Sequence, residues 1–270
     1  MLVHANQKAK MKVGYCQYDV KRDREENLRL LESLLPTMKC DLIVLPELCL
    51  GGYLFTDEET LARQSERVPD GPSVKRMMAL SGVCGCAIVY GMAEQADAKL
   101  YNTAVVVDHG RFTGRYRKIH LTDYEKRFFN RGDDNPVFDL GTCRIGVQIC
   151  FDLWFPEVSR EQLAKGAEVL CALANFGGET TCGIARTRAI ENLTPLVLCN
   201  RIGAENLPGI DATFLGKSAL IDRDGKTIRH AEAGHPAFES GTIAPGGKRA
   251  NVICADFPEE IALHHSSRDA

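Results

Sequence analysis

Short apolar runs alternate with helical stretches along the whole chain, and this alternation limits the possible folds more than any other feature. Asp41–Leu45, Arg144–Ile149 and Val169–Ala174 are apolar runs of strand length. Glu25–Leu35 carries leucines at helical spacing, and Pro156–Lys165 begins with the proline that is common in the first turn of a helix. Strands that alternate with helices are typical of an α/β domain.

Two hairpin signals indicate that the sheets are not purely parallel. Tyr101–Asp108 and Arg111–Tyr116 flank a His-Gly turn, and Lys217–Asp222 and Lys226–His230 flank a turn that contains Asp-Gly. Because such pairs are antiparallel, we predict a layered α/β fold with mixed sheets.

No linker, low-complexity segment or internal repeat divides the 270 residues. The hydrophobic fraction of 44% and the charged fraction of 26% are ordinary for a globular protein with a substantial core. A last strand is predicted over Val252–Asp256. We therefore predict a single domain over residues 11–257, with short polar tails at 1–10 and 258–270.

The charge pattern disfavours two classes of partner. The net charge is −3 with both signs interspersed, so no basic stripe indicates binding to nucleic acid. The longest uncharged run, between Arg76 and Glu94, is short and interrupted by glycines, which disfavours a membrane span. Because Met1–Lys10 carries no apolar signal region, we expect a soluble, cytoplasmic protein.

Cysteine usage indicates free thiols. The chain has 11 cysteines, an odd number, and several lie inside apolar runs, as Cys171 and Cys199 do. Cys84 and Cys86 form a Cys-x-Cys pair, but no second pair or His-x-x-x-His spacing accompanies it. We therefore expect neither a disulfide framework nor a structural metal.

Cys150 is the residue with the strongest claim to chemistry. It ends an apolar strand and precedes a turn and a proline-led helix, at the sheet edge where α/β enzymes usually hold their active sites. A nucleophilic thiol needs a base or a positive neighbour. Of the seven histidines, only His120 lies in a motif-like segment, and we interpret all of them as surface or structural residues. If Cys150 were only a packing residue, the sequence would say little about function.

Charged residues offer another way to activate the thiol. Glu47 directly follows the apolar run 41–46 and could act as a partly desolvated general base, or it could be a solvated loop residue. Lys118 could stabilise an oxyanion, and Glu125 could pair with that lysine. Taken singly, both of the latter would be interpreted as exposed surface charges.

The combination of these segments resembles a known family. Pro46–Leu48, Tyr116–Leu121 and Ile149–Glu157, in this order, are similar to the three signatures of the nitrilase superfamily of carbon–nitrogen hydrolases. The resemblance extends from about residue 11 to the early 230s. It implies a four-layer αββα sandwich of the nitrilase type in a single domain, and a homodimer or higher homo-oligomer.

The resemblance also implies the site. The family's catalytic glutamate, lysine and cysteine fall on Glu47, Lys118 and Cys150, and its frequent second glutamate falls on Glu125. The implied reaction attacks a carbonyl carbon with the thiol, stabilises the oxyanion with the lysine and the backbone N–H of Phe151, and passes through a thioester. It needs no metal and no organic cofactor.

The implied substrate is a small molecule. True nitrilases resemble one another in a Cys-Trp-Glu signature, whereas Cys150 is followed here by Phe-Asp, which favours the amidase and carbamoylase branch. We therefore expect hydrolysis of a small linear amide, with an N-carbamoyl compound or an aliphatic nitrile as alternatives. Four residues near the motifs could line the pocket or pack in the core, namely Tyr53, Trp154, Asn175 and Phe176.

Two alternatives come from other functional classes. One is a non-catalytic, nitrilase-like binding protein, which the presence of all three key residues disfavours. The other is a thiol redox protein that uses Cys150 or the Cys84/Cys86 pair, which the absence of a Cys-x-x-Cys motif disfavours.

Overall fold

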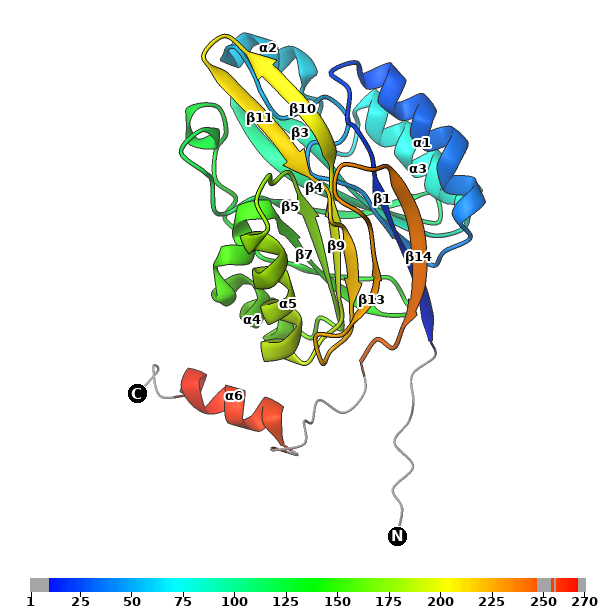
Figure 1. The fold of residues 1–270 in the computed structure, drawn as a ribbon, viewed down its shortest axis with the longest axis vertical. Coiled ribbons are helices and arrows are strands. Elements are labelled where there is room, and N and C mark those ends of the chain that lie inside the picture. The colour runs from blue at the N-terminus through cyan, green and yellow to red at the C-terminus, as the bar shows by residue number, and fades with distance from the viewer. Residues whose placement is uncertain (1–9, 247–253, 255, 267–270) are drawn as a thin grey trace.

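Two mixed sheets of six strands form the centre of the molecule (Figure 1). The computed structural model describes residues 10–246, 254 and 256–266. The first sheet contains β1 (Met11–Gln17), β2 (Leu42–Val44), β3 (Ala87–Ala96), β4 (Lys99–Asp108), β5 (Arg111–Arg117) and β14 (Ala237–Ile243). Their order across the sheet is β14-β1-β2-β3-β4-β5, in which the neighbouring pairs β1–β2 and β2–β3 are parallel and the other pairs are antiparallel.

The second sheet repeats this arrangement. It contains β6 (Val137–Asp139), β7 (Arg144–Ile149), β8 (Val169–Ala174), β9 (Leu196–Asn200), β12 (Ala219–Ile221) and β13 (Thr227–His230). The order is β13-β12-β9-β8-β7-β6, with β7, β8 and β9 parallel and the remaining pairs antiparallel. The predicted mixed sheets and both predicted hairpins are therefore confirmed.

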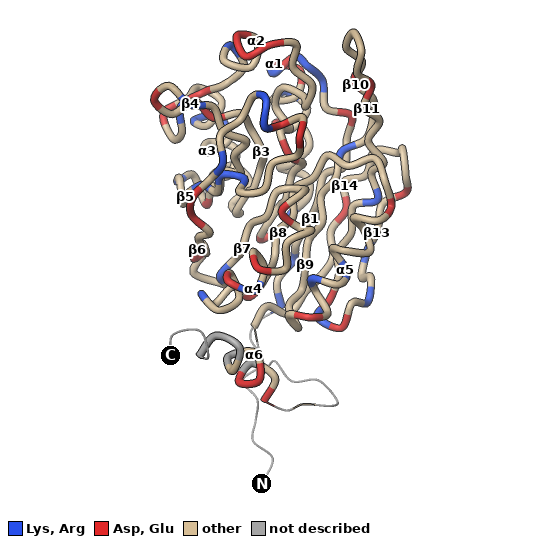
Figure 2. Tube along the Cα trace, turned by 90° about the vertical axis from the view of Figure 1, so that its left-hand side faces the viewer, with Lys and Arg blue, Asp and Glu red and all other residues tan. Residues whose placement is uncertain are grey.

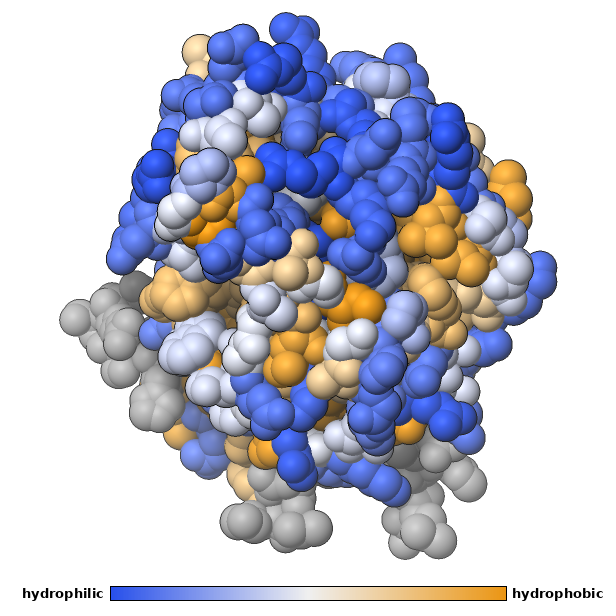
Figure 3. All heavy atoms as spheres, turned by 45° about the horizontal axis from the view of Figure 1, so that its top comes forward, coloured by the Kyte–Doolittle hydropathy of each residue, from blue (hydrophilic) through white to orange (hydrophobic). Residues whose placement is uncertain are grey.

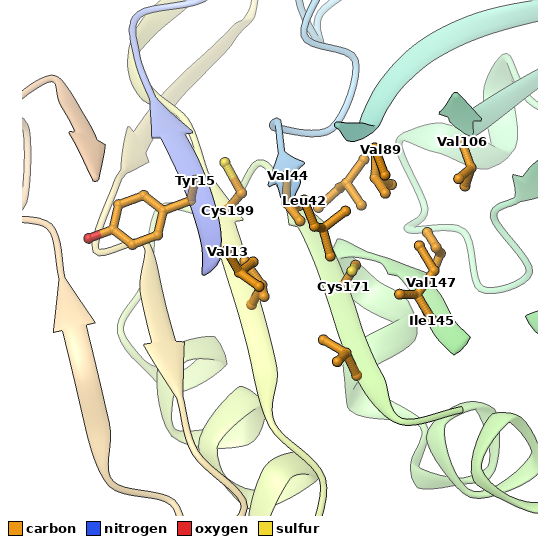
Figure 4. Close-up of a cluster of buried hydrophobic side chains, with 14 of the residues drawn as sticks. Val13, Tyr15, Leu42, Val44, Val89, Val106, Ile145, Val147, Cys171 and Cys199 are labelled. Atoms are coloured by element: carbon orange, nitrogen blue, oxygen red, sulfur yellow. The ribbon is translucent and has the colours of Figure 1, made fainter. Parts of the chain in front are cut away.

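The two sheets pack face to face through the largest apolar cluster. Alternate residues of the facing strands fill it, among them Leu42 and Val44 from β2 and Ile145 and Val147 from β7 (Figure 4). Because side chains alternate across a strand, the other half of each strand's residues faces outward toward helices.

Helices cover the outer face of each sheet. α1 (Arg24–Met38) and α3 (Pro72–Cys84) close a second apolar cluster on the first sheet, and α4 (Pro156–Ala164) and α5 (Thr180–Asn192) cover the second sheet. The side chain of Asp23 caps α1 by accepting from the N–H groups of Glu25 and Glu26. The molecule is thus the predicted αββα sandwich in a single domain.

The remaining elements lie at the ends of the sandwich. α2 (Glu58–Gln64) and the unpredicted hairpin of β10 (Ile202–Leu207) and β11 (Ile210–Leu215) lie at the same end in Figure 1. α6 (Phe257–Ser266) lies apart from the layers and takes up part of the range expected as a polar tail. In the predicted strand Val252–Asp256, residues 252, 253 and 255 lie outside the described residues.

Acidic and basic residues are interspersed along the Cα trace in Figure 2, and neither sign gathers in one region of that view. Seen from the end that carries α2 and the β10–β11 hairpin, hydrophobic side chains form separate groups among hydrophilic ones (Figure 3). Within the described part of the chain, no helix has the length and apolar character needed to span a membrane.

Candidate active site

The topology brings several strand ends to one edge of the sandwich. β2 is one of the parallel strands of the first sheet, and β7 and β8 are parallel neighbours in the second. β2 packs across from β8. Glu47 follows β2, Cys150 follows β7 and Asn175 follows β8. Lys118, the first residue after β5, continues the alternation that points Tyr116 between the sheets.

Cys150 lies at a sharp change of backbone direction. β7 ends at Ile149, and a 3₁₀ helix, η2 (Cys150–Trp154), starts at the cysteine with φ of 48° in the left-handed region. Cys150 is partly exposed. The first N–H groups of a helix have no partner within it, so the N–H of Phe151 is available beside the thiol.

Glu47 is fully buried and only half satisfied. Its Oε1 accepts hydrogen bonds from Lys118 Nζ at 2.7 Å and Asn102 Nδ2 at 2.6 Å. Its Oε2 has no hydrogen-bond partner among the described residues. Gly91 of β3 allows this loop to lie close, because a Cβ there would be 2.7 Å from the Cα of Glu47. One carboxylate oxygen is therefore fixed and the other is free.

Lys118 connects two buried carboxylates. Its Nζ lies 2.7 Å from Oε1 of Glu47 and 2.7 Å from Oε1 of Glu125, which begins the 3₁₀ helix η1 (Glu125–Arg127). Asn102 Nδ2 donates to the same oxygen of Glu125 at 2.9 Å. The other oxygen of Glu125 accepts from the N–H of Thr122 at 2.9 Å. The ammonium is thus held in one place by two negative charges.

Burial and charge shift the pKa values of this group. Burial raises the pKa of Glu47 to about 7, against the opposing charge of Lys118. Burial also acts to raise the pKa of Glu125, but the charge and hydrogen bonds of Lys118 outweigh it and the pKa is lowered. Burial acts to lower the pKa of Lys118, and the two carboxylates outweigh it, so that this pKa lies well above its usual range.

The Cys150 thiol shares this environment. Burial, and next the negative charge of Glu47, raise the pKa of the thiol, while Lys118 and a backbone hydrogen bond with Asn175 act to lower it. The thiol is therefore protonated at neutral pH. Glu47 has a free oxygen and a pKa near neutrality, which suits a group that accepts and returns a proton.

The structure separates the four residues named as possible pocket lining. Tyr53 lies close enough to Glu125, Lys118, Glu47 and Cys150 that their charges affect its pKa, which burial raises. Asn175 is buried beside the thiol, and neither polar atom of its side chain has a partner among the described residues. Phe176 packs in the apolar cluster under α5, and Trp154 is 46% exposed.

Asp152 ties the cysteine turn to the end of β5. Its Oδ2 accepts from Tyr116 Oη at 2.8 Å and from the N–H of Ile149 at 3.1 Å, and its Oδ1 accepts from the N–H of His120 at 2.9 Å. The His120 ring also lies 3.0 Å from Asp152 Oδ1 and stacks on Phe155 at 3.6 Å, which agrees with a structural role for this histidine.

Asn102 and Asp152 are two residues of the site for which the sequence alone indicates no role. The signal for Asn102 was the alternation on β4, in which Ala104 and Val106 share its face between the sheets. For Asp152 no local signal exists, because its partners come from β5 and the segment that follows it. Among the described residues, no group of three or more His, Cys, Asp or Glu side chains is arranged to hold a metal ion.

Comparison with known proteins decides the family. The family model described as "Carbon-nitrogen hydrolase" matches residues 12–246. The chain belongs to this family. It is a member of the nitrilase superfamily and a hydrolase of carbon–nitrogen bonds other than peptide bonds.

Individual relatives agree with this assignment. The chain is 37% identical over 226 residues to a "Nitrilase" of Pyrococcus abyssi, which covers 82% of this chain and 85% of the relative. It is 30% identical over 269 residues to an "N-carbamoylputrescine amidase" of Solanum lycopersicum, with 91% and 85% covered. An amidase from Nesterenkonia sp. shares the fold, with a TM-score of 0.78, 22% identity and 98% of both chains covered.

Replacing Asp152 by asparagine tests whether this carboxylate holds the site together. Asp152→Asn puts an amide NH₂ against groups that themselves donate, so at least one buried donor loses its acceptor. We expect the free energy of unfolding in urea to fall by about 2–4 kcal/mol. Asp123→Asn, at a carboxylate whose side chain is 98% exposed, is the control and should change it by less than about 0.5 kcal/mol. Equal effects of the two substitutions would contradict this role.

Proposed function

We propose that this hydrolase cleaves small linear amides through a thioester on Cys150, with Glu47 as general base and acid and Lys118 in the oxyanion site. The observation that carries the proposal is the state of Glu47. One oxygen is fixed by Lys118 and Asn102, the other has no partner in the described ranges of the chain, and the thiol beside it needs a proton acceptor. Glu125 holds the lysine from the other side.

Acylation follows from these positions. Glu47 Oε2 takes the proton from the thiol as the sulfur attacks the carbonyl carbon, and the carbonyl π electrons move to oxygen. Lys118 and the N–H of Phe151 stabilise that oxyanion. The oxyanion collapses, the C–N bond breaks, and Glu47 returns the proton to the departing nitrogen, which leaves as ammonia or amine.

Deacylation uses the same carboxylate. Water attacks the thioester carbonyl while Glu47 removes one of its protons, and the oxyanion forms again at Lys118. Collapse breaks the C–S bond, the carboxylic acid leaves and the proton on Glu47 returns to the sulfur. Because the thiol's pKa is raised, the thiolate forms only as the new bond forms, so that no free thiolate accumulates.

Substitution of Cys150 tests the mechanism on a defined panel. We expect the wild-type protein to release ammonia from at least one of butyramide, succinamic acid and N-carbamoyl-β-alanine, and Cys150→Ala to lower this release to background, since the substitution removes the sulfur that carries the acyl group. Cys84→Ala is the matched control, because this thiol is also partly exposed and lies far from Cys150 in the sequence, and the variant should keep wild-type turnover. Undiminished turnover by Cys150→Ala would contradict the mechanism.

The pH dependence of kcat/KM tests the role of Glu47. The base must be deprotonated to accept the thiol proton, so kcat/KM should rise with pH through about 7, the raised pKa of Glu47. Lys118, Glu125, Cys150 and Tyr53 are the titratable groups that face this carboxylate. In Glu47→Gln this rise should disappear along with most activity. A wild-type midpoint near 4.5, the ordinary value for glutamate, would contradict the assignment.

One observation favours a second candidate, the hydrolysis of N-carbamoyl compounds. Asn175 presents a donor and an acceptor beside the nucleophile, both buried and without a partner in the part of the chain that the structure describes. An alkyl amide uses its carbonyl oxygen and nitrogen at the oxyanion site and at Glu47, and its alkyl chain offers Asn175 nothing. A ureido group adds an N–H next to the reacting carbon, which Asn175 Oδ1 could accept. The relative from Solanum lycopersicum carries the name of such an amidase.

Replacing Asn175 distinguishes the two candidates. If its carboxamide binds a ureido N–H, Asn175→Leu should lower kcat/KM for N-carbamoyl-β-alanine by about ten- to a hundredfold, because a buried hydrogen bond is lost. Turnover of butyramide by the same variant should change less than about threefold and serves as the internal control. Equal losses of kcat/KM on both substrates would show that Asn175 does not recognise the ureido group. The amide would then be the candidate substrate that is left.

A further inference from the structure

The β10–β11 hairpin belongs to neither six-stranded sheet, yet it contacts the loop that follows Glu47. It forms a two-stranded sheet of its own at one end of the sandwich (Figure 1). Phe214 of β11 meets the ring of Tyr53 edge-on, with ring centroids 6.1 Å apart, and Tyr53 lies near the charged group of the site. An element outside the main fold therefore touches the candidate active site.

A single carboxylate joins the hairpin to this loop. Glu205 of β10 accepts from the N–H of Tyr53 at 2.9 Å and from the N–H of Leu54 at 2.8 Å, and it pairs with the buried guanidinium of Arg201. Gly52, with φ of 88°, lets the loop come this close, because a Cβ there would lie 2.9 Å from Glu205 Oε1. Two backbone donors, of which that of Leu54 is buried, thus depend on one side chain.

Hydrogen bonds and covalent links continue from Tyr53 to the charges of the site. Tyr53 Oη lies 3.3 Å from Oγ1 of Thr122. The same Oγ1 accepts from the N–H of Glu125 at 3.2 Å, and the N–H of Thr122 donates to Glu125 Oε2 at 2.9 Å. Glu125 in turn holds Lys118 Nζ at 2.7 Å. The path from Glu205 to Lys118 is unbroken.

We infer that Glu205 is a positioning residue for the hydrolytic reaction. By fixing the loop at Tyr53 and Leu54, it sets the position of the Tyr53 hydroxyl, and through Thr122 and Glu125 the position of the Lys118 ammonium. A displacement of that ammonium by a fraction of an ångström weakens its contact with the oxyanion, which exists only in the transition state. The inference rests on the proposed function for its effect on turnover.

Glu205→Gln is the first test. Glutamine removes the charge and puts an NH₂ in place of the oxygen that accepts from Arg201 or of the oxygen that accepts from the N–H of Leu54, so at least one of these donors loses its acceptor and the attachment of the loop is weakened. With the best amide of the panel, and with rates normalised to the titratable Cys150 thiol, we expect kcat to fall about tenfold or more while KM changes less than about threefold. A loss of active protein alone would change neither the normalised kcat nor KM.

A matched control separates positioning from general stability. Glu66 is also a buried carboxylate that accepts from an arginine, Arg24, and from the backbone N–H and hydroxyl of one residue, Ser73. Glu66→Gln should lower the melting temperature comparably and leave normalised kcat within about twofold. If Glu66→Gln lowers kcat as much as Glu205→Gln does, the inference is overturned.

A double-mutant cycle tests the route through Tyr53. Tyr53→Phe removes the hydroxyl and leaves the ring. If Glu205 acts through this hydroxyl, Glu205→Gln with Tyr53→Phe should lower kcat no further than the more severe single variant. Fully additive effects would overturn the inference. Should Glu205→Gln fail to fold because Arg201 loses its counter-charge, Glu205→Asp keeps the charge and withdraws the oxygens, and the same fall in kcat is expected.

A second readout needs no substrate and keeps the inference separable from the proposed function. The rate at which iodoacetamide alkylates Cys150, followed by peptide mapping because the chain has ten other free cysteines, depends on the same neighbouring charges. It should fall at least threefold in Glu205→Gln and stay unchanged in Glu66→Gln. If the wild-type protein cleaves no amide of the panel, the proposed function fails, and the alkylation rates still decide the role of Glu205. If the Glu205→Gln protein has the alkylation rate and the kcat of the wild-type protein, the inference is overturned.

Discussion

The buried contact of Lys118 with two carboxylates is the interaction on which the site depends. The three charged side chains are fully buried, and each carboxylate accepts a hydrogen bond from the ammonium. Removing one partner of a buried ion pair typically costs about 3–5 kcal/mol because the remaining charge is uncompensated. The same contact fixes one oxygen of Glu47 and leaves its other oxygen unpaired, so that a structural requirement and a chemical one are met by one arrangement.

The fold explains how four distant segments reach this arrangement. The apolar layer between the sheets fixes the spacing of β2, β5, β7 and β8, and the residues that follow these strands are the first polar groups beyond it. Asp152 and Asn102 then connect the segments, Asp152 from the cysteine turn to the end of β5, and Asn102 from β4 to Glu47 and Glu125. The hairpin that carries Glu205 adds a further connection from outside the sandwich.

The sequence predicts those strands and helices whose apolar residues recur at the regular spacing of one kind of element. The parallel strands β7, β8 and β9, the hairpin of β4 and β5 and the helices between them were predictable, because each buries a regular apolar face. β10 and β11 were not, because neither contains a continuous apolar run and most of their residues are only partly buried or exposed, although Pro208-Gly209 marks their turn. β14 was missed for the same reason, as an edge strand with mostly half-buried residues.

Less of the site than of the fold could be predicted from the sequence. Glu47 and Lys118 are 71 positions apart, and periodicity gives no reason to bring them together. The resemblance to a family supplied that link, and the structure shows the contact. The unpaired oxygen of Glu47, the bonds of Asp152 and the attachment of Glu205 to Tyr53 depend on three-dimensional distances that no local pattern encodes.

The most direct measurement of the central claim is the mass of the protein during turnover. The wild-type protein, mixed with a turned-over amide and quenched in acid during turnover, should gain the mass of the acyl group on part of its molecules, since the thioester forms before water hydrolyses it. Peptide mapping should place this mass on Cys150, and the Cys150→Ala protein should show none. Wild-type turnover of the amide without any acyl adduct on Cys150 would contradict the account.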